Sequence, residues 1–273
     1  MLWLRDDFKQ AWQGCDPFEK VETLQGNVYR QLEARKTLQF EQDGKSFFVK
    51  IHRGVGWKEI LDNLIRLRAP VLGAGNEWRA IQKLESLGVN TMTAVAFGEK
   101  SNNPARQKSF IVTEDLTNTI SLEDLCAQWS AHPPSFRLKK ALIEKVADIS
   151  CRLHSNGVNH RDFYICHFLL YIPDGIAGID PDNLHLSLID LHRSQIREKT
   201  PKRWLIKDIA GLWFSAFDIG LTQRDIYRFI RIYTGLPLRE AFTQYQWLWR
   251  PLERKAQKLY HRYHRKLNNG DRL

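Results

Sequence analysis

The sequence has little cysteine and lacks the cysteine patterns that metal sites and disulfide frameworks need. No C-x-x-C pair occurs, and the spacings match none that are typical of small secreted proteins. Because disulfides are rare in the reducing cytosol, we expect free thiols and a cytoplasmic protein. The four residues concerned are Cys15, Cys126, Cys151 and Cys166.

Long apolar runs are also missing. The first ten residues mix charged and apolar side chains and so lack the apolar core of a signal peptide. The longest apolar stretch, residues 209–221, is too short to span a bilayer and contains Asp218. We therefore expect no transmembrane segment, although the protein can still bind to a membrane surface.

Aromatic residues and basic residues, in contrast, are abundant. Hydrophobic residues make up 43% of the 273 residues and include nine Trp and fourteen Phe, which is typical of a globular chain with a core. Forty-one Lys and Arg against thirty-one Asp and Glu give a formal charge of +10. Such a charge favours anionic partners. Nucleic acid is not expected among them, because no helix-turn-helix or RNA-binding motif is present.

The first part of the chain is expected to be β-rich with one helix. A turn at residues 25–27 precedes a strand pair, and Asp43-Gly44 is a strong hairpin signal before a strand over 46–51. Apolar residues at helical spacing predict a helix over 76–87 that ends at Gly88. Two further strands are expected near 92–98 and 109–113.

Beyond residue 116 the pattern becomes mostly helical. Residues 121–124 resemble a capping box, and a stripe with a period of 3.6 residues predicts a long helix over 136–155. Turns at 173–175 and 181–183 precede a strand over 186–191, and helices continue from there. The change near residue 116 predicts two units, a β-rich N-lobe over 1–116 and a helical C-lobe over 117–273.

The residues with the strongest chemical signal are two aspartates. His160-Arg161-Asp162 follows the long helix, and Asp190 comes 28 residues after Asp162, at the end of an apolar strand. Phosphoryl transfer needs one carboxylate for the acceptor hydroxyl and another for the Mg²⁺ that bridges the phosphates. Upstream, Lys50 lies in a strand, as does the lysine that contacts nucleotide phosphates in kinases, and Glu77 lies in the first turn of the helix. Their order along the chain is that of a kinase.

Several sequence strings then point to one family. NHRDFYICHFLL at 159–170, IDLHR at 189–193, VKIHRG at 49–54, SFIVTE at 109–114 and TPKRW at 200–204 resemble the lipopolysaccharide core heptose kinases of Gram-negative bacteria. The resemblance covers roughly residues 15–245. It implies an α+β, bilobal, protein-kinase-like fold and transfer of phosphate from ATP to the first heptose of the inner core, at its 4-hydroxyl.

The resemblance also implies roles for individual residues. Asp162 is the catalytic base and Asp190 the magnesium ligand. The residues expected at the ATP between the lobes are Lys50 for the phosphates, Glu77 as its partner, Gly26 near the phosphates, and Glu114 with Leu116 as backbone groups for adenine. Asp208 is expected to support the catalytic loop by accepting backbone N–H bonds, and His160 and Arg161 are expected to support it structurally.

Three features depart from the wider kinase pattern. No G-x-G-x-x-G loop is present, so Gly26 alone is available to approach the phosphates. His167 stands where protein kinases have the Asn that holds a second Mg²⁺. It is a candidate metal ligand by position, although Mg²⁺ prefers oxygen. His192 replaces the Gly of the D-F-G motif, which indicates an enzyme without an activation switch.

Basic residues suggest where anionic partners bind. The residues expected to contact the acceptor glycolipid are Arg193, Arg197, Lys202 and Arg203. The tail from 250 to 273 combines basic residues with an apolar side that includes Leu252, Leu259 and Leu267. An amphipathic helix of this kind is expected to bind the anionic inner leaflet of the cytoplasmic membrane. The resemblance further implies acyl carrier protein as a partner.

Other interpretations remain open from the sequence. The acceptor could instead be an aminoglycoside or a protein tyrosine, with the same two aspartates at work. A non-catalytic, kinase-like binding module would explain the thin glycine loop and His167, but Lys50, Asp162 and Asp190 are all retained. Glu77 could simply interact with the helix dipole, and the basic segment could be a solvated surface.

Overall fold

The computed structural model describes residues 1–32, 34–65, 73–101 and 103–268. The chain forms two compact units. Unit 1 contains Met1–Glu85, Thr91–Leu116 and Leu191–Arg193, and unit 2 contains Ser86–Asn90, Thr117–Asp190 and Ser194–Leu273. One division between the units falls after Leu116, where the sequence pattern changes. However, residues 86–90 belong to unit 2, where the Asn90 carbonyl accepts a hydrogen bond from the Leu188 N–H at 2.9 Å.

Unit 1 is built on a six-stranded antiparallel sheet with the strand order β1-β5-β6-β4-β3-β2. Asp43 and Gly44 join β3 to β4 with φ angles of 50° and 71°, as a tight hairpin turn requires. Lys50 on β4 lies opposite Thr37 on β3 and Ile111 on β6. The strands are β1 (Leu2–Leu4), β2 (Asn27–Leu32), β3 (Arg35–Gln42), β4 (Lys45–His52), β5 (Ala94–Lys100) and β6 (Lys108–Glu114).

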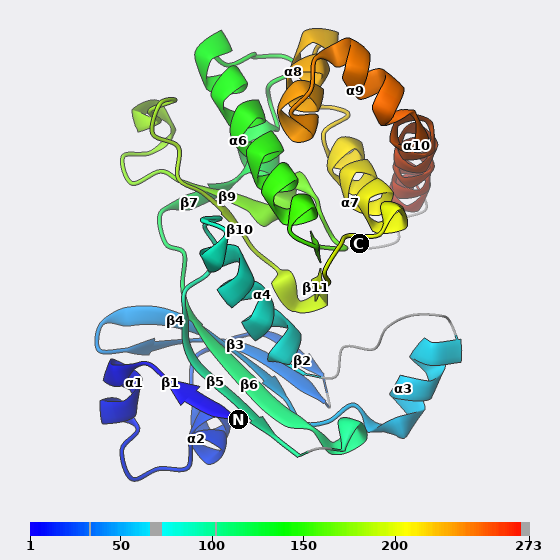
Figure 1. Ribbon diagram of the computed structural model, residues 1–273. Coiled ribbons are helices and arrows are strands. Elements are labelled where there is room, and N and C mark those ends of the chain that lie inside the picture. The colour runs from blue at the N-terminus through cyan, green and yellow to red at the C-terminus, as the bar shows by residue number, and fades with distance from the viewer. Residues whose placement is uncertain (33, 66–72, 102, 269–273) are drawn as a thin grey trace. The chain divides into compact units, whose positions relative to one another are not determined.

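The described part of unit 1 has four α-helices, so the expectation of one helix was wrong. They are α1 (Asp6–Ala11), α2 (Pro17–Thr23), α3 (Gly56–Ile65) and α4 (Gly75–Ser86). Helices α1 and α2 have six and seven residues, which is too short for a clear 3.6-residue period. Phe8 of α1, Val21 of α2 and Trp12, which follows α1, are buried and pack with strand residues in one core cluster. Figure 1 shows α1 and α2 close to the sheet.

Helix α4 packs through its own aromatic residue. The Trp78 ring stacks on Phe97 of β5, with centroids 5.0 Å apart, and also contacts Trp3 of β1 at 4.8 Å. The helix ends next to Gly88, whose φ is 65°, as expected for a glycine C-cap. These contacts fix α4 against the sheet and thereby determine where its first turn, with Glu77, is placed.

Unit 2 is mostly helical, with two small sheets. Helix α6 (Phe136–Ser155) has the predicted bounds, and its N-cap Ser135 accepts a hydrogen bond from the Leu138 N–H. Besides α6, the helices are α5 (Leu122–Cys126), α7 (Lys202–Ser215), α8 (Gln223–Thr234), α9 (Leu238–Gln244) and α10 (Gln246–Asn268). The short strands are β7 (Thr119–Ser121), β8 (Val158–Asn159), β9 (Phe168–Tyr171), β10 (Leu186–Leu188) and β11 (Gln195–Ile196). The strand predicted over 186–191 therefore ends early, because Asp190 has a φ of +62°, which a strand does not accommodate.

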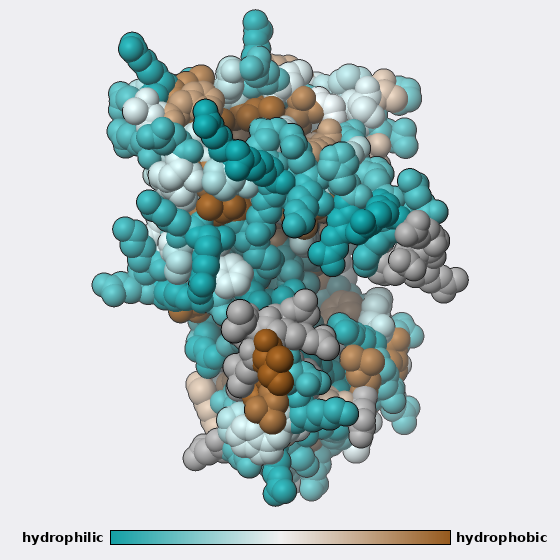
Figure 2. Space-filling view, turned by 90° about the vertical axis from the view of Figure 1, so that its right-hand side faces the viewer, coloured by the Kyte–Doolittle hydropathy of each residue, from teal (hydrophilic) through white to brown (hydrophobic). Residues whose placement is uncertain are grey.

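The C-terminal helix α10 is amphipathic, and part of the apolar side expected to bind a membrane packs on residues of unit 2. The Tyr263 ring packs edge-on to Phe214 of α7, with centroids 5.7 Å apart, and Tyr260 contacts Phe217 at 5.2 Å. Leu248 is fully buried. Figure 2 shows mostly hydrophilic side chains on the side of the molecule that carries α10. Among the described residues, no helix is both long and apolar enough to cross a membrane.

Candidate active site

The candidate catalytic loop connects α6 to β9 and has an unusual backbone conformation. Arg161 has a φ of +77° although it is not glycine, a left-handed conformation that is uncommon and costly for such residues. Strain of this kind persists only where surrounding contacts stabilise it. Asp162 follows Arg161 in this loop, and Asp190 follows Ile189, whose carbonyl accepts a hydrogen bond from His160.

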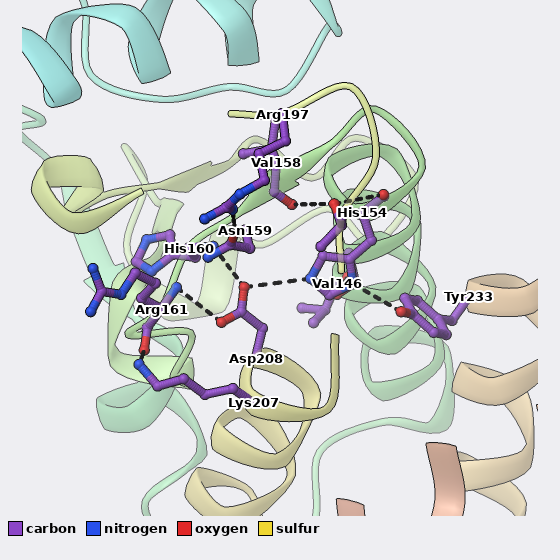
Figure 3. Close-up of polar contacts among 12 residues, drawn as sticks. Val146, His154, Val158, Asn159, His160, Arg161, Arg197, Lys207, Asp208 and Tyr233 are labelled. Atoms are coloured by element: carbon purple, nitrogen blue, oxygen red, sulfur yellow. Dashed lines mark hydrogen bonds and ion pairs between the residues drawn. The ribbon is translucent and has the colours of Figure 1, made fainter. Parts of the chain in front are cut away.

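Asp208 of α7 supplies the main support of the loop. Its buried carboxylate accepts hydrogen bonds from the backbone N–H of His160 at 2.6 Å and of Arg161 at 2.9 Å. The neighbouring Lys207 donates from Nζ to the Arg161 carbonyl, and Figure 3 shows both contacts. Hydrogen bonds to a charged group are stronger than neutral ones. Asp208 therefore offsets the cost of the left-handed turn just before Asp162.

Three further residues extend this network, and sequence reasoning missed all three. His154 lies 3.5 Å from Asp208 (Nε2 to Oδ2), and its Nδ1 is 2.9 Å from the Tyr233 hydroxyl. The Thr200 hydroxyl donates to the His154 carbonyl at 3.0 Å. Burial raises the pKa of Tyr233, so its phenol stays neutral. In the sequence, His154 and Tyr233 appear only as polar residues at core-facing positions of α6 and α8. Such a position does not specify which residue it will contact.

His160 connects the catalytic loop to the segment before Asp190. Its ring is fully buried, and Nε2 lies 2.8 Å from the Ile189 carbonyl oxygen. Because a carbonyl only accepts, Nε2 carries the hydrogen. Burial lowers the pKa of His160, so the imidazole is neutral at pH 7. The geometry is therefore that of a buried structural histidine.

Asp162, His167 and Asp190 come together on this scaffold. His167 Nδ1 lies 2.6 Å from the backbone oxygen of Asp162, and Nε2 lies 3.6 Å from Oδ2 of Asp190. The Ile189 N–H donates to the His167 carbonyl at 2.9 Å. The left-handed conformation of Asp190 turns the chain immediately after this hydrogen bond. Unit 2 thus brings the backbone of Asp162 and the carboxylate of Asp190 to the two nitrogens of one imidazole.

In unit 1, Lys50 and Glu77 form an ion pair. Lys50 Nζ on β4 lies 2.7 Å from Oε1 of Glu77 on α4. Glu77 is only 1% exposed, so its charge depends on this partner. Removing the lysine would leave the buried Glu77 charge uncompensated, which is destabilising. The pair fixes the lysine headgroup on the sheet.

The other nucleotide candidates of unit 1 have mixed surroundings. A Cβ on Gly26 would lie 2.0 Å from the Gln39 carbonyl oxygen, so the close approach of β2 to β3 already requires glycine there. The Glu114 N–H donates to Thr93 at 2.8 Å, and its carboxylate accepts from Arg5 at 2.6 Å. Only the Glu114 carbonyl could therefore serve adenine. Leu116 is the last residue of this part of unit 1. Arg5 was not anticipated from the sequence.

The four basic acceptor candidates differ in their contacts. Arg197 uses two of its nitrogens inside unit 2, with Asn159 Oδ1 and Gln195 Oε1 both at 2.6 Å. Burial and the nearby Arg203 lower its pKa. In the first turn of α7, Lys202 lies over the Trp247 ring at 4.7 Å, and Arg203 lies over Trp204 at 5.4 Å. Arg193 belongs to the short segment of unit 1 at Leu191–Arg193.

Unit 2 also contains an apolar cavity that the sequence did not reveal. Its volume is about 390 Å³, and residues of α6, α7, α8 and α10 line it. Because these helices are far apart in the sequence, periodicity shows that each has an apolar face but not that the faces leave a space between them. The lining residues include Leu142, Val146, Leu212, Trp213, Phe229, Ile230, Trp249 and Leu252.

Comparison with known proteins adds independent information. A family model described as the lipopolysaccharide kinase (Kdo/WaaP) family matches residues 19–233. The lipopolysaccharide core heptose(I) kinase WaaP of Pseudomonas aeruginosa is 55% identical over 272 residues, covering 100% of this chain and 99% of the relative. WaaP of Escherichia coli is 53% identical over 266 residues, covering 97% and 99%.

A solved structure gives the same answer for the fold. WaaP in complex with acyl carrier protein aligns with a TM-score of 0.83 at 52% identity, covering 95% of this chain and 99% of that one. The expected combination of a β-rich N-terminal part with a helical C-terminal part is thereby confirmed as a kinase-like fold. From its sequence match and its fold, the chain belongs to the lipopolysaccharide kinase (Kdo/WaaP) family.

Proposed function

We propose that this protein is a kinase that transfers phosphate from ATP to the first heptose of the lipopolysaccharide inner core, at the 4-hydroxyl. The observation that carries the proposal is the identity of 55% and 53% to two core heptose(I) kinases over nearly their full lengths. The aminoglycoside, protein-tyrosine and non-catalytic alternatives have no comparable support.

Each unit contributes a different part of the ATP chemistry. In unit 1, Lys50 is the contact for the phosphates, and Glu77 holds it in place at 2.7 Å. The Glu114 carbonyl and the Leu116 N–H are the groups proposed for adenine. Gly26, which precedes β2 and lies against Gln39, is the glycine proposed to approach the phosphates. In unit 2, Asp190 is an oxygen ligand of the type that Mg²⁺ prefers. Bound Mg²⁺ would neutralise charge on the transferred phosphate.

Asp162 is the proposed catalytic base. It orients the heptose hydroxyl and accepts its proton as the hydroxyl oxygen bonds to phosphorus. The backbone of Asp162 is held from both sides, since Asp208 binds the two preceding N–H groups and His167 donates to the Asp162 carbonyl. Positioning of this kind, together with charge neutralisation, supplies most of the acceleration of phosphoryl transfer.

The test is transfer of labelled phosphate to core lipopolysaccharide that lacks heptose phosphate. We expect label on the glycolipid with the wild type and a loss of about 10²- to 10⁴-fold with Asp162→Ala. ATP binding should persist in the variant, because Asp162 is not among the residues proposed to hold the nucleotide. Label on an aminoglycoside or a tyrosine peptide, with none on the glycolipid, would reject the proposed acceptor.

We also propose that the protein works at the cytoplasmic face of the inner membrane. Because much of the apolar side of α10 packs within unit 2, we place the bilayer contact on another surface. Helix α3 exposes Trp57, Leu61 and Ile65, which are 56%, 53% and 79% exposed and four residues apart, so they share one face. Figure 2 shows apolar atoms on the face that carries α3. Replacing the three by Ser should abolish sedimentation with anionic vesicles.

Acyl carrier protein is the proposed protein partner, since the solved relative is a complex with it. The basic surface expected from the +10 charge suits an acidic partner. The apolar cavity of unit 2 is suited to an acyl chain, which has no polar groups to satisfy. We expect acyl-loaded carrier protein to raise the melting temperature of the wild type more than the unloaded form does. Leu142→Trp, which fills the cavity, should remove that difference.

A further inference from the structure

The hydrogen bond of His167 to the catalytic loop identifies its tautomer. Nδ1 lies 2.6 Å from the backbone oxygen of Asp162. A carbonyl oxygen has no hydrogen to donate, so Nδ1 must carry one. In a neutral imidazole the other nitrogen then carries a lone pair. With the ring uncharged, the Nε2 atom of His167 is an electron-pair donor.

That lone pair faces a carboxylate. Nε2 of His167 and Oδ2 of Asp190 are 3.6 Å apart, which is beyond hydrogen-bond length. Two ligand atoms that each lie about 2.1 Å from one metal ion are separated by about 3.0 Å at a right angle and about 3.6 Å at 120°. The observed 3.6 Å lies at the 120° end of this range, and an octahedral ion would draw the two atoms to about 3.0 Å.

The arrangement is held from several sides. The Ile189 N–H donates to the His167 carbonyl at 2.9 Å, which fixes Asp190 relative to His167. The ring of the buried His160 lies nearly parallel to the His167 ring, with centroids 5.7 Å apart and an interplanar angle of 29°. Preorganised ligands of this kind are typical of metal sites.

A neutral histidine can replace the asparagine that protein kinases use at this position. In those enzymes the catalytic-loop Asn holds a metal ion, and its amide offers one donor group and one acceptor atom. Neutral His167 offers the same pair, Nδ1–H as donor and Nε2 as acceptor. The exchange keeps the hydrogen bond to Asp162 and changes the metal-binding atom from oxygen to nitrogen.

We propose that Nε2 of His167, together with Asp190, is a direct ligand of the divalent ion in the nucleotide complex. This inference rests on the proposed kinase function. The nitrogen ligand makes the site favour ions that accept imidazole, such as Mn²⁺ and Co²⁺, over Mg²⁺ more strongly than an asparagine site would. Within the described ranges no group of three or more His, Cys, Asp or Glu could hold a metal, so phosphate oxygens and water complete the shell.

The test uses Mn²⁺ as a spectroscopic probe and needs no turnover. Mn²⁺ and a non-hydrolysable ATP analogue are added to the full chain, and pulsed electron paramagnetic resonance records nitrogen couplings to the ion. We expect the coupling of a directly bound imidazole in the wild type. Labelling the histidines with ¹⁵N should change this signal in the unmutated protein, which identifies histidine even if a variant folds poorly.

Two variants then assign the residue. His167→Asn should remove the coupling, while the matched variant His192→Asn, two residues from Asp190, should keep it. Competition between the two ions should show the change in metal preference. The Mg²⁺ concentration that displaces bound Mn²⁺ should be about tenfold lower in His167→Asn than in the wild type. An imidazole coupling that survives in His167→Asn, or bound Mn²⁺ without one in the wild type, would reject the proposal.

The outcome of the metal-binding test does not depend on which acceptor the kinase uses. Phosphate transfer to the glycolipid by wild type that shows no nitrogen coupling would leave the kinase assignment standing and overturn the role of His167. It would instead indicate that His167 is protonated and paired with Asp190. A clear coupling without transfer to any glycolipid would support the metal ligand and contradict the proposed function.

Discussion

At the residue scale, the site depends on two non-glycine residues in left-handed backbone conformations. Arg161 and Asp190 have φ angles of +77° and +62°, and each such residue costs about 1–3 kcal/mol. Arg161 is compensated by Asp208 and Lys207. The turn at Asp190 follows Ile189, whose N–H and carbonyl bind His167 and His160. Beside Asp162 and at Asp190, the strained backbone therefore lies next to the hydrogen bonds that stabilise it.

Replacing Asp208 tests this support. In Asp208→Asn the amide keeps one acceptor oxygen for two backbone N–H groups, so one buried N–H loses its partner at a cost of about 1–3 kcal/mol. We expect a lower free energy of unfolding, measured in urea, and a kcat reduced by more than about tenfold because Asp162 is displaced. The exposed Asp174→Asn is the control and should change neither quantity. An unchanged kcat in Asp208→Asn would contradict the positioning role.

A second residue-scale prediction concerns acid sensitivity. Burial, with Arg35 and Lys50 nearby, lowers the pKa of His52 to about 4 from an ordinary value of 6.5. Between these two values the unfolded chain binds a proton that the folded chain does not, so falling pH favours unfolding. By pH 5 the loss relative to pH 7 is about 2 kcal/mol.

Urea unfolding at pH 7 and pH 5 measures this effect. The loss of stability between the two pH values should be about 2 kcal/mol smaller in His52→Leu than in the wild type. Substitution of the exposed His132 by Leu should leave the pH dependence as it is. Equal pH dependence in wild type and His52→Leu would show that His52 does not carry the effect.

At the scale of elements, α7 connects the catalytic loop to the C-terminal helix. One side of α7 presents the buried Asp208 to the loop, and Phe214 near its end packs on Tyr263 of α10. The sequence pattern of α10 did predict an amphipathic helix. Part of its apolar side packs on protein. The hydrophobic effect alone does not distinguish burial against protein from burial in a membrane.

This packing predicts a large loss of stability on truncating one leucine of α10 and almost none on truncating another. Leu248 is fully buried and Leu267 is 47% exposed. Leu248→Ala should lower the free energy of unfolding of unit 2 by about 2–5 kcal/mol, because it leaves a cavity. Leu267→Ala should change it by less than about 0.5 kcal/mol. Denaturant titration of the full chain measures both. Similar small effects for the two would show that α10 is not packed as described.

At the scale of the whole molecule, the formal charge of +10 acts over longer distances than any single contact. An anionic glycolipid is attracted to such a surface, and salt screens the attraction, with a Debye length of about 10 Å at 0.1 M and about 3 Å at 1 M. The charge therefore affects encounter with the acceptor rather than the chemical step.

Kinetics at different salt concentrations test this. The KM for core lipopolysaccharide should rise several-fold between about 0.05 and 0.5 M salt, whereas kcat should change little. A heptose acceptor without phosphate or carboxylate groups is the control, and its KM should be nearly constant. A salt-independent KM for the glycolipid would show that the net charge does not contribute to acceptor binding.

Much of the architecture was determined by the sequence itself. The hairpin at Asp43-Gly44, the helix over 136–155 and the order of Lys50, Glu77, Asp162 and Asp190 all follow from local patterns. These patterns are readable because side chains two to four residues apart share a face of a strand or helix. The short helices α1 and α2 were missed since six or seven residues contain less than two full turns.

Only the tertiary structure decided which distant groups meet. Asp208 binds N–H groups 48 and 47 residues away, and His154 meets Tyr233 across 79 residues. The tautomer of His167, the cavity of unit 2 and the covered side of α10 likewise depend on how helices pack. Local periodicity specifies the face that each element buries, but a contact between two elements depends on where the folded chain places both.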